Sequence, residues 1–403
     1  MKTWRRTSAN GRALLVAVLV TGLTTFMFLP LLAIHFTAEG LPAGRVGFLV
    51  GLLAFCSQGF SLVCGLIVDR LGTRVVLTSG FALRIVGYLL LALGDGGRMV
   101  PLVAGIAAIG VGGSLLGLSI KTLLVREDSV QPREMLALRS TFVNIGVVAG
   151  PALGAVVYPL GFSYILAACV LSHLLLGIRL TLRPAARALP GPPAATEAAK
   201  NGPAAGGPPD DGPPRWERWR WVPLCLVGAA FWAIYSQLNV LLPITARELT
   251  GSTEAISVVF TLNGVLCVLF QYTLLHHVFG KAATRTLLVV GFVAFACAYA
   301  VFIPLAGWYS LLAFVLPVTV AEMLIAPSLD EQAVKVSSVR RTGLALGTMS
   351  AAGAVGSLLG SSMGGYLLQT LHGGTGVWLV LVLFSLAAAA TSFLLPKVHT
   401  QHA

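Results

Sequence analysis

Twelve predominantly apolar stretches of about 18 or more residues follow one another along the 403-residue chain. Only 10% of the residues are charged, against about 25% in a soluble domain, and the mean hydropathy is +0.87. A soluble core of this size cannot bury so much apolar surface, so we expect the stretches to cross a lipid bilayer as helices. This excludes an ordinary soluble enzyme, a disordered protein and a coiled coil. The predicted spans are 13–36, 44–68, 75–93, 99–125, 137–159, 162–182, 222–246, 253–276, 286–305, 308–333, 343–367 and 375–395.

A segment rich in proline, glycine and alanine separates the first six spans from the last six. It has no apolar periodicity, and its composition is typical of a linker. The sequence therefore predicts five parts, namely an N-terminal tail at 1–12, a six-helix bundle at 13–182, a linker at 183–221, a second bundle at 222–395 and a C-terminal tail at 396–403.

The formal net charge of +12 would suggest nucleic acid as a partner if the protein were soluble. Here it is better explained by topology. With the N-terminus in the cytoplasm, most of the 27 lysines and arginines fall in cytoplasmic segments or near cytoplasmic helix ends. We therefore expect a multi-pass protein of the plasma (inner) membrane with both termini and the linker in the cytoplasm. The lipid bilayer is then the partner, and no nucleic acid is expected.

No sequence pattern for a metal or cofactor site is found. The six cysteines lie inside apolar runs, and none forms a CxxC pair or a His/Cys cluster with zinc spacing. The sequence also lacks a nucleotide-binding Gly-rich loop, a GxSxG motif and an HExxH motif. We expect no metal, no cofactor and no enzymatic activity.

The segment GLIVDRLGTR ends the second predicted span. In it, Gly65 permits close helix contact, Asp69 can complement a helix dipole and Gly72 suits a tight turn. Arg70 and Arg74 offer cations to a neighbouring carboxylate or a lipid phosphate. These five residues are the candidate gating loop.

The fifth predicted span contains small residues at a spacing of four, followed by a proline. Gly146, Gly150 and Gly154 form a flat face for close packing, and Pro151 interrupts the helical hydrogen bonds. The alternatives are a sealing contact between the two bundles and ordinary helix packing.

On these motifs, and on twelve spans in two halves, the chain resembles the major facilitator superfamily, and in particular its twelve-helix drug:proton antiporter branch. The candidate gating loop resembles motif A, and the glycine-rich segment resembles motif C, which in this superfamily marks exporters. The resemblance implies an all-α membrane fold with two six-helix halves, a substrate cavity between them and transport by alternating access. It also implies a monomer, the usual state in the family.

Two charged residues lie inside the predicted spans. Glu322 is the one acidic residue deep in an apolar run, where an ionised carboxylate is costly, and this suits a group that takes up and releases protons. The segment around it resembles helix 10 of drug and siderophore exporters, where an acidic residue handles protons or cationic drugs. Arg84 in the third span is either its partner in proton coupling or a structural residue, paired with a neighbour such as Gln58 or snorkelling.

Polar and aromatic side chains within the spans are candidates for the substrate cavity, and they are Phe26, Gln58, Asn144, Trp232, Tyr235, Gln237 and Asn263. The sequence favours a proton-coupled exporter of small amphipathic compounds such as drugs, metabolites or siderophores. The alternatives are a facilitator or proton symporter that takes up a small nutrient, and a transporter-like partner or receptor protein that acts through its linker.

Overall fold

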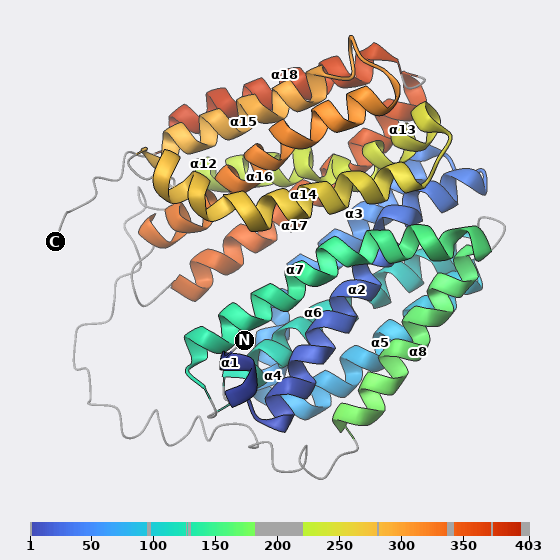
Figure 1. The fold of residues 1–403 in the computed structure, drawn as a ribbon, viewed down its shortest axis with the longest axis vertical. Helices are drawn as coiled ribbons and strands as arrows, with labels where there is room; N and C mark the ends of the chain where they lie inside the picture. The colour runs from blue at the N-terminus through green and yellow to red at the C-terminus, as the bar shows by residue number, and fades with distance from the viewer. Residues whose placement is uncertain are drawn as a thin grey trace.

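The computed structural model describes residues 2–94, 98–125, 127, 130–181, 221–279, 282–336, 342–371 and 374–395, and within these ranges every regular element is a helix (Figure 1). The predicted linker and C-terminal tail therefore lie almost entirely outside the described residues. Nine of the described helices are long and apolar enough to cross a membrane. Two shorter apolar helices and the 29-residue helix Thr342–Thr370 accompany them, so the arrangement is consistent with the twelve predicted spans.

The N-terminal half begins with a short helix and continues with the helices of the first bundle. Their bounds are α1 Lys2–Arg6, α2 Ala9–Ala38, α3 Ala43–Gly59, α4 Ser61–Leu71, α5 Thr73–Ala92, α6 Met99–Val125, α7 Pro132–Val157, a 3-10 turn η1 at Tyr158–Leu160, and α8 Phe162–Thr181. The second predicted span is thus divided into α3 and α4, and the division falls at Phe60.

The C-terminal half repeats this plan. Its elements are α12 Trp221–Tyr235, a 3-10 turn η2 at Ser236–Asn239, α13 Leu241–Thr250, α14 Glu254–Thr273, a π-helical turn η3 at Leu274–Val278, α15 Thr284–Ala300, α16 Gly307–Val336, α17 Thr342–Thr370, α18 Thr375–Thr391 and a 3-10 turn η5 at Ser392–Leu394. The seventh predicted span is therefore interrupted at η2. Pro243 explains the interruption, because it lacks an N–H group and its ring would clash with the carbonyl of Asn239 in a continuous helix.

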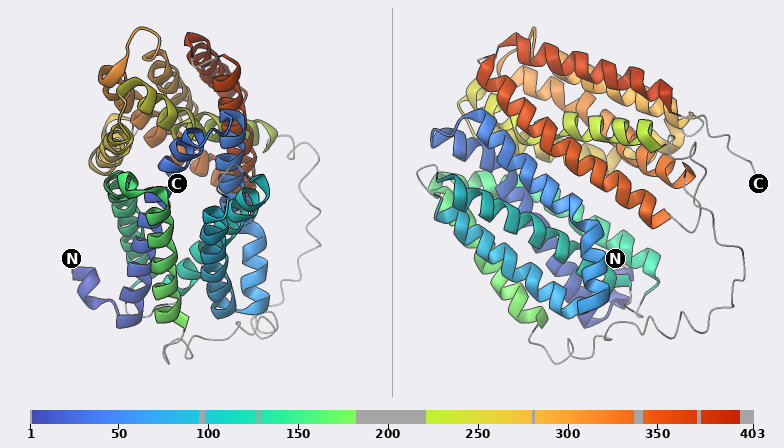
Figure 2. Two further views of the ribbon diagram at one scale, coloured as in Figure 1. Left: turned by 90° about the vertical axis from the view of Figure 1, so that its right-hand side faces the viewer. Right: turned by 180° about the vertical axis from the view of Figure 1, so that it is seen from behind.

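Equivalent helices pair in the two halves. In the N-terminal half α2 packs along α7, and in the C-terminal half α12 packs along α17. Between the halves, α3 packs along α17 and α7 along α14, so α7 and α17 each contact a helix of their own bundle and a helix of the other (Figure 2).

The glycines of the fifth span contact α2 in the same half. A Cβ atom on Gly146 would lie 2.9 Å from the Gly22 carbonyl carbon, and one on Gly154 would lie 2.5 Å from the Met27 carbonyl oxygen. The glycine face therefore lets two backbones of one bundle approach closely. The glycines themselves thus pack within one bundle, and a sealing role of this segment between the bundles stays a prediction.

Several hydrogen bonds between the halves lie toward the end of the molecule opposite to both termini, which we call the far end. Ser257 Oγ donates to the Pro151 carbonyl at 2.6 Å, and Thr261 Oγ1 donates to the Val148 carbonyl at 3.2 Å. Beside them, Arg247 Nη1 donates to the Ile34 carbonyl at 3.4 Å. In the segment that resembles the exporter motif, the carbonyls of Val148 and Pro151 join the two bundles, while the glycines face α2.

Candidate functional site

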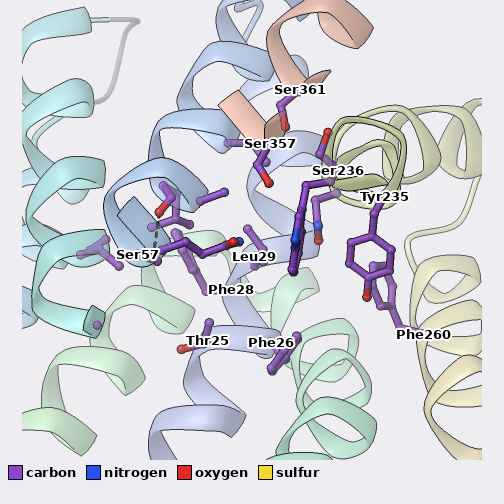
Figure 3. Close-up of a pocket in the computed structure, with 18 of the residues that line it drawn as sticks. Thr25, Phe26, Phe28, Leu29, Ser57, Tyr235, Ser236, Phe260, Ser357 and Ser361 are labelled. Carbon is purple, nitrogen blue, oxygen red and sulfur yellow. Dashed lines mark hydrogen bonds between the residues drawn. The ribbon is translucent and has the colours of Figure 1, made fainter. Parts of the chain in front are cut away.

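A cavity of about 430 Å³ lies between the two bundles. Side chains from both halves close around it, and Figure 3 shows Thr25, Phe26 and Ser57 facing Tyr235 and Phe260 across the space. Its lining residues are Thr25, Phe26, Phe28, Leu29, Val50, Leu53, Ala54, Ser57, Gln58, Arg84, Ile109, Gly113, Trp232, Tyr235, Ser236, Asn239, Phe260, Ser357 and Ser361.

The lining combines aromatic rings with a few hydroxyl and amide groups. Four of the predicted cavity residues belong to it, namely Phe26, Gln58, Trp232 and Tyr235. Mostly apolar walls with a small number of polar groups are typical of a site for a small amphipathic molecule. The volume is within the range of such sites.

Glu322 lies on α16, next to this cavity but not among its lining residues. Tyr235 Oη donates a hydrogen bond to Glu322 Oε1 at 2.9 Å, and Asn263 Nδ2 donates to Glu322 Oε2 at 3.2 Å. Asn263 also donates to Thr319 Oγ1 at 3.0 Å. Each carboxyl oxygen thus has a neutral donor, and one of these donors, Tyr235, lines the cavity.

Arg84 lies on α5 and lines the cavity from the N-terminal half. Its side chain is only 5% exposed. Its Nη2 donates to Thr25 Oγ1 at 2.7 Å and to Tyr88 Oη at 2.9 Å, while its Nε has no hydrogen-bond partner. Among the described residues, no salt bridge joins Arg84 to a carboxylate, and none joins it to Glu322. Arg84 lies in the N-terminal bundle and Glu322 in the C-terminal bundle, so the two charged residues inside the predicted spans belong to different bundles.

Three predicted cavity residues are placed elsewhere. Asn144 is exposed on α7, and Asn263 is bound to Glu322 behind the cavity wall.

Gln237 is 1% exposed, and its Nε2 donates to the carbonyls of Ala233 at 2.9 Å and Gly360 at 2.8 Å. Gln237 therefore ties the η2 turn to α17, and it is the neighbouring Ser236 and Asn239 that reach the cavity.

The candidate gating loop lies at the junction of α4 and α5. Gly72 ends α4 with a φ of 81°, a conformation that favours glycine, and its N–H donates to the Val68 carbonyl at 3.0 Å. Arg70 and Arg74 are exposed. Gly65 and Asp69 lie within α4, but the surroundings of the first and the side chain of the second fall outside what the structure describes.

Sequence reasoning missed the cavity hydroxyls of Thr25, Ser57, Ser357 and Ser361. A hydroxyl in an apolar helix commonly bonds to its own backbone, as Ser57 Oγ does to the Leu53 carbonyl at 2.7 Å, so its position in the sequence does not reveal a cavity. The polar residues within 236–239, followed by Pro243, are a sequence signal from which the interruption of this helix could have been predicted. No group of three or more His, Cys, Asp or Glu side chains that could hold a metal occurs in the described part of the chain.

Two helical bundles of like plan around a shared cavity define the class of secondary membrane transporters. The sequence matches the model of the Major Facilitator Superfamily over residues 14–329, which is most of the chain. The protein belongs to the Major Facilitator Superfamily and is a multi-pass membrane transporter.

Similar proteins include curated relatives and solved structures. The multidrug resistance protein MdtH of Aeromonas hydrophila is 26% identical over 349 residues, which cover 81% of both chains. MdtH of Aeromonas salmonicida is 24% identical over 383 residues, or 92% of this chain and 90% of that protein. A crystal structure of a POT peptide transporter superimposes with a TM-score of 0.79 at 14% identity, over 95% of this chain and 93% of that one. At this identity the last likeness shows the fold alone.

Proposed function

We propose that the protein is a proton-coupled exporter of small amphipathic compounds in the plasma membrane, with both termini in the cytoplasm. The distribution of lysine and arginine supports this orientation. The relatives named multidrug resistance proteins support export of varied small molecules. The cavity between the bundles supplies a binding site of suitable size and character.

The observation that carries proton coupling is the hydrogen bond between Tyr235 and Glu322. Glu322 is the proton carrier of this proposal, and Tyr235 connects its carboxyl group to the cavity. A molecule that packs against Tyr235 alters the hydrogen bond that Glu322 accepts. Substrate binding and proton binding can then influence each other through one hydroxyl group.

Alternating access would require the contacts at the far end to open while the end with the termini closes. Ser257, Thr261 and Arg247 hold the far end through hydrogen bonds to backbone carbonyls of the other bundle. Such bonds contribute about 0.5–1.5 kcal/mol each, so a few of them can be exchanged during rocking of the bundles. The gating loop at Gly72 lies at the opposite end and is proposed to act there.

Transport into inverted membrane vesicles tests the proposal. Their interior corresponds to the outside of the cell, so an interior made acidic drives an exporter to accumulate its substrate. The probes are three dansyl dyes of different charge, namely dansylglycine (anionic), dansylglycinamide (neutral) and monodansylcadaverine (cationic). We expect accumulation of at least one dye, abolished by a protonophore and by Glu322→Gln. The matched control is Glu248→Gln, the same chemical change at an exposed position of α13.

Each other outcome contradicts a defined part of the proposal. Proton-driven accumulation that persists in Glu322→Gln would make Glu322 a structural residue. Accumulation only in right-side-out vesicles with an acidic exterior would indicate an uptake symporter, and movement that ignores the proton gradient would indicate a facilitator.

A further inference from the structure

Another, smaller cavity of about 160 Å³ lies in the N-terminal half, between α2, α5, α6 and α7. It shares Thr25, Phe26, Arg84 and Gly113 with the large cavity, so the two adjoin at Arg84. We call it the arginine chamber. Its lining residues are Val18, Thr21, Gly22, Thr25, Phe26, Arg84, Gly113, Leu116, Gly117, Ile120, Arg139 and Val143.

Two arginines line this chamber, and neither is neutralised within the described residues. Arg84 is 5% exposed, and Arg139 on α7 is partly buried. The Nε atoms of both are buried and have no hydrogen-bond partner. Among the described residues that line the two cavities there is no Asp or Glu.

A guanidinium group that is removed from water without a counter-charge is costly, because the lost hydration is not replaced. An anion that entered the chamber would restore the charge balance, and the guanidinium groups of the two lining arginines would donate hydrogen bonds to it. Arginine suits this task, since its planar donors bind carboxylate, sulfonate or phosphonate oxygens at two points.

We propose that the arginine chamber binds the anionic group of the substrate, while the apolar body of the substrate occupies the adjoining large cavity. The proposal rests on the transport function above and gives its substrate class, an amphipathic molecule with one acidic group. The hydroxyls of Thr21 and Thr25 lie in the same chamber. Thr25 Oγ1 accepts from Arg84 and donates to the Thr21 carbonyl at 2.7 Å, which holds the guanidinium in place.

The size of the chamber limits the group that it takes. At about 160 Å³ it has space for an acid group and its immediate attachment, and the aromatic rings Phe26, Trp232, Tyr235 and Phe260 line the large cavity. We therefore expect the anionic group and the aromatic rings of a substrate to contribute separately to the free energy of binding.

Fluorescence titration of the purified full-length protein in a neutral detergent tests the assignment. Dansylglycine and dansylglycinamide share one fluorophore and differ in the carboxylate alone. We expect the protein to bind dansylglycine at least about tenfold more tightly, which is the effect of one charge-assisted hydrogen-bonded pair. Arg139→Gln should remove this preference, and Arg139→Lys should keep much of it.

Two further variants keep the test decisive. Arg84→Gln should also remove the preference, and if it fails to fold, Arg139→Gln carries the test, because no hydrogen bond holds Arg139 among the described residues. Arg179→Gln is the matched control, since Arg179 is an exposed arginine of the same bundle outside both cavities. Equal binding of the two dyes to the wild type, or an unchanged preference in Arg139→Gln, would overturn the proposal.

A lipid headgroup could supply the same phosphate chemistry, so phosphatidylglycerol is titrated separately. Binding of this lipid that Arg139→Gln abolishes, together with an absence of dansylglycine binding, would assign the chamber to lipid and overturn its assignment to substrate. Failure of the transport function gives a different result, in which dansylglycine binds with the expected preference but no dye moves with the proton gradient.

Discussion

The Tyr235 hydroxyl donates to the Glu322 carboxyl group at 2.9 Å, and this bond joins the wall of the central cavity to an acidic residue that does not itself line it. Tyr235 ends α12 directly before the interrupted stretch Ser236–Asn239, while Glu322 lies within α16. A hydrogen bond at a helix interruption can change when the helices on either side move. In the proposed mechanism, this pair carries the link between the cavity and the protonation of Glu322.

Replacing Tyr235 with Phe keeps the ring and removes the hydroxyl. We expect proton-driven dye accumulation in inverted vesicles to fall by about 2- to 10-fold, because Glu322 loses one of its two donors and its connection to the cavity. Exchange of dye without a proton gradient should change less, since the aromatic wall remains.

The matched control for this change is Tyr299→Phe. The Tyr299 hydroxyl is also buried, but it donates to the Ile234 carbonyl at 2.8 Å and does not line the cavity. Loss of coupling in both variants to the same extent would show a general effect of tyrosine hydroxyls in this bundle and would contradict the special role of Tyr235.

Adding one methyl group at Gly154 should destabilise the N-terminal half. The new Cβ would lie 2.5 Å from the Met27 carbonyl oxygen, so α2 and α7 must separate. We expect Gly154→Ala to cost about 1–3 kcal/mol, measured as a lower melting temperature of the purified protein. Gly113→Ala is the control, because nothing lies within 4 Å of a Cβ there. Equal melting temperatures for the two variants would mean that the helix pair tolerates separation.

Removing the Ser257 hydroxyl should favour opening of the far end. Ser257→Ala deletes the 2.6 Å hydrogen bond to the Pro151 carbonyl, at a cost of about 0.5–1.5 kcal/mol to the closed arrangement. Spin labels at Glu39 and Glu254, introduced in a Cys297→Ser background because Cys297 is exposed, would report the distance between the halves. We expect the longer distances to gain about 2- to 10-fold in population.

The control for this variant is Ser385→Ala, whose hydroxyl donates to the Leu381 carbonyl within α18. The same removal of a buried hydroxyl should leave the distance distribution unchanged there. A distribution that Ser257→Ala leaves unaltered would indicate that the remaining contacts, including the hydrogen bonds of Thr261 and Arg247, hold the far end without Ser257.

The sequence was sufficient for the overall architecture, because helices in lipid must satisfy their own backbone and so appear as long apolar runs. Interruptions within a span could be predicted only where the local sequence marks them. Pro243 accounts for the interruption at η2, whereas no proline marks the division between α3 and α4 at Phe60. The partner of the glycine face on α7 could not be predicted either, since small residues suit contact with α2 and with α14 equally well.

For the candidate site, a charged side chain within an apolar run was the sequence feature that located residues at or near the cavity. Glu322 and Arg84 stand out in apolar runs, and both lie at or beside the cavity. Neutral polar residues were harder to place, because an amide can bridge helices as well as face a ligand. Asn144 and Gln237 illustrate this, the first exposed on α7 and the second bound to backbone carbonyls. The orientation of a side chain around its helix decides between these roles, and it depends on tertiary packing.

Gln237 and Asn239, two residues apart in η2, should respond in opposite ways to removal. Gln237→Ala deletes hydrogen bonds to α12 and α17 and leaves a cavity in a buried position, so we expect a loss of about 2 kcal/mol or more in stability and little change in dye affinity. Asn239→Ala removes a side chain that lines the central cavity, so dye affinity should change while the melting temperature stays near that of the wild type. Thermal unfolding and fluorescence titration of the same two variants measure both quantities. A loss of dye affinity in Gln237→Ala at full stability would place Gln237 in the substrate site after all, and would require the η2 turn to rearrange when substrate binds.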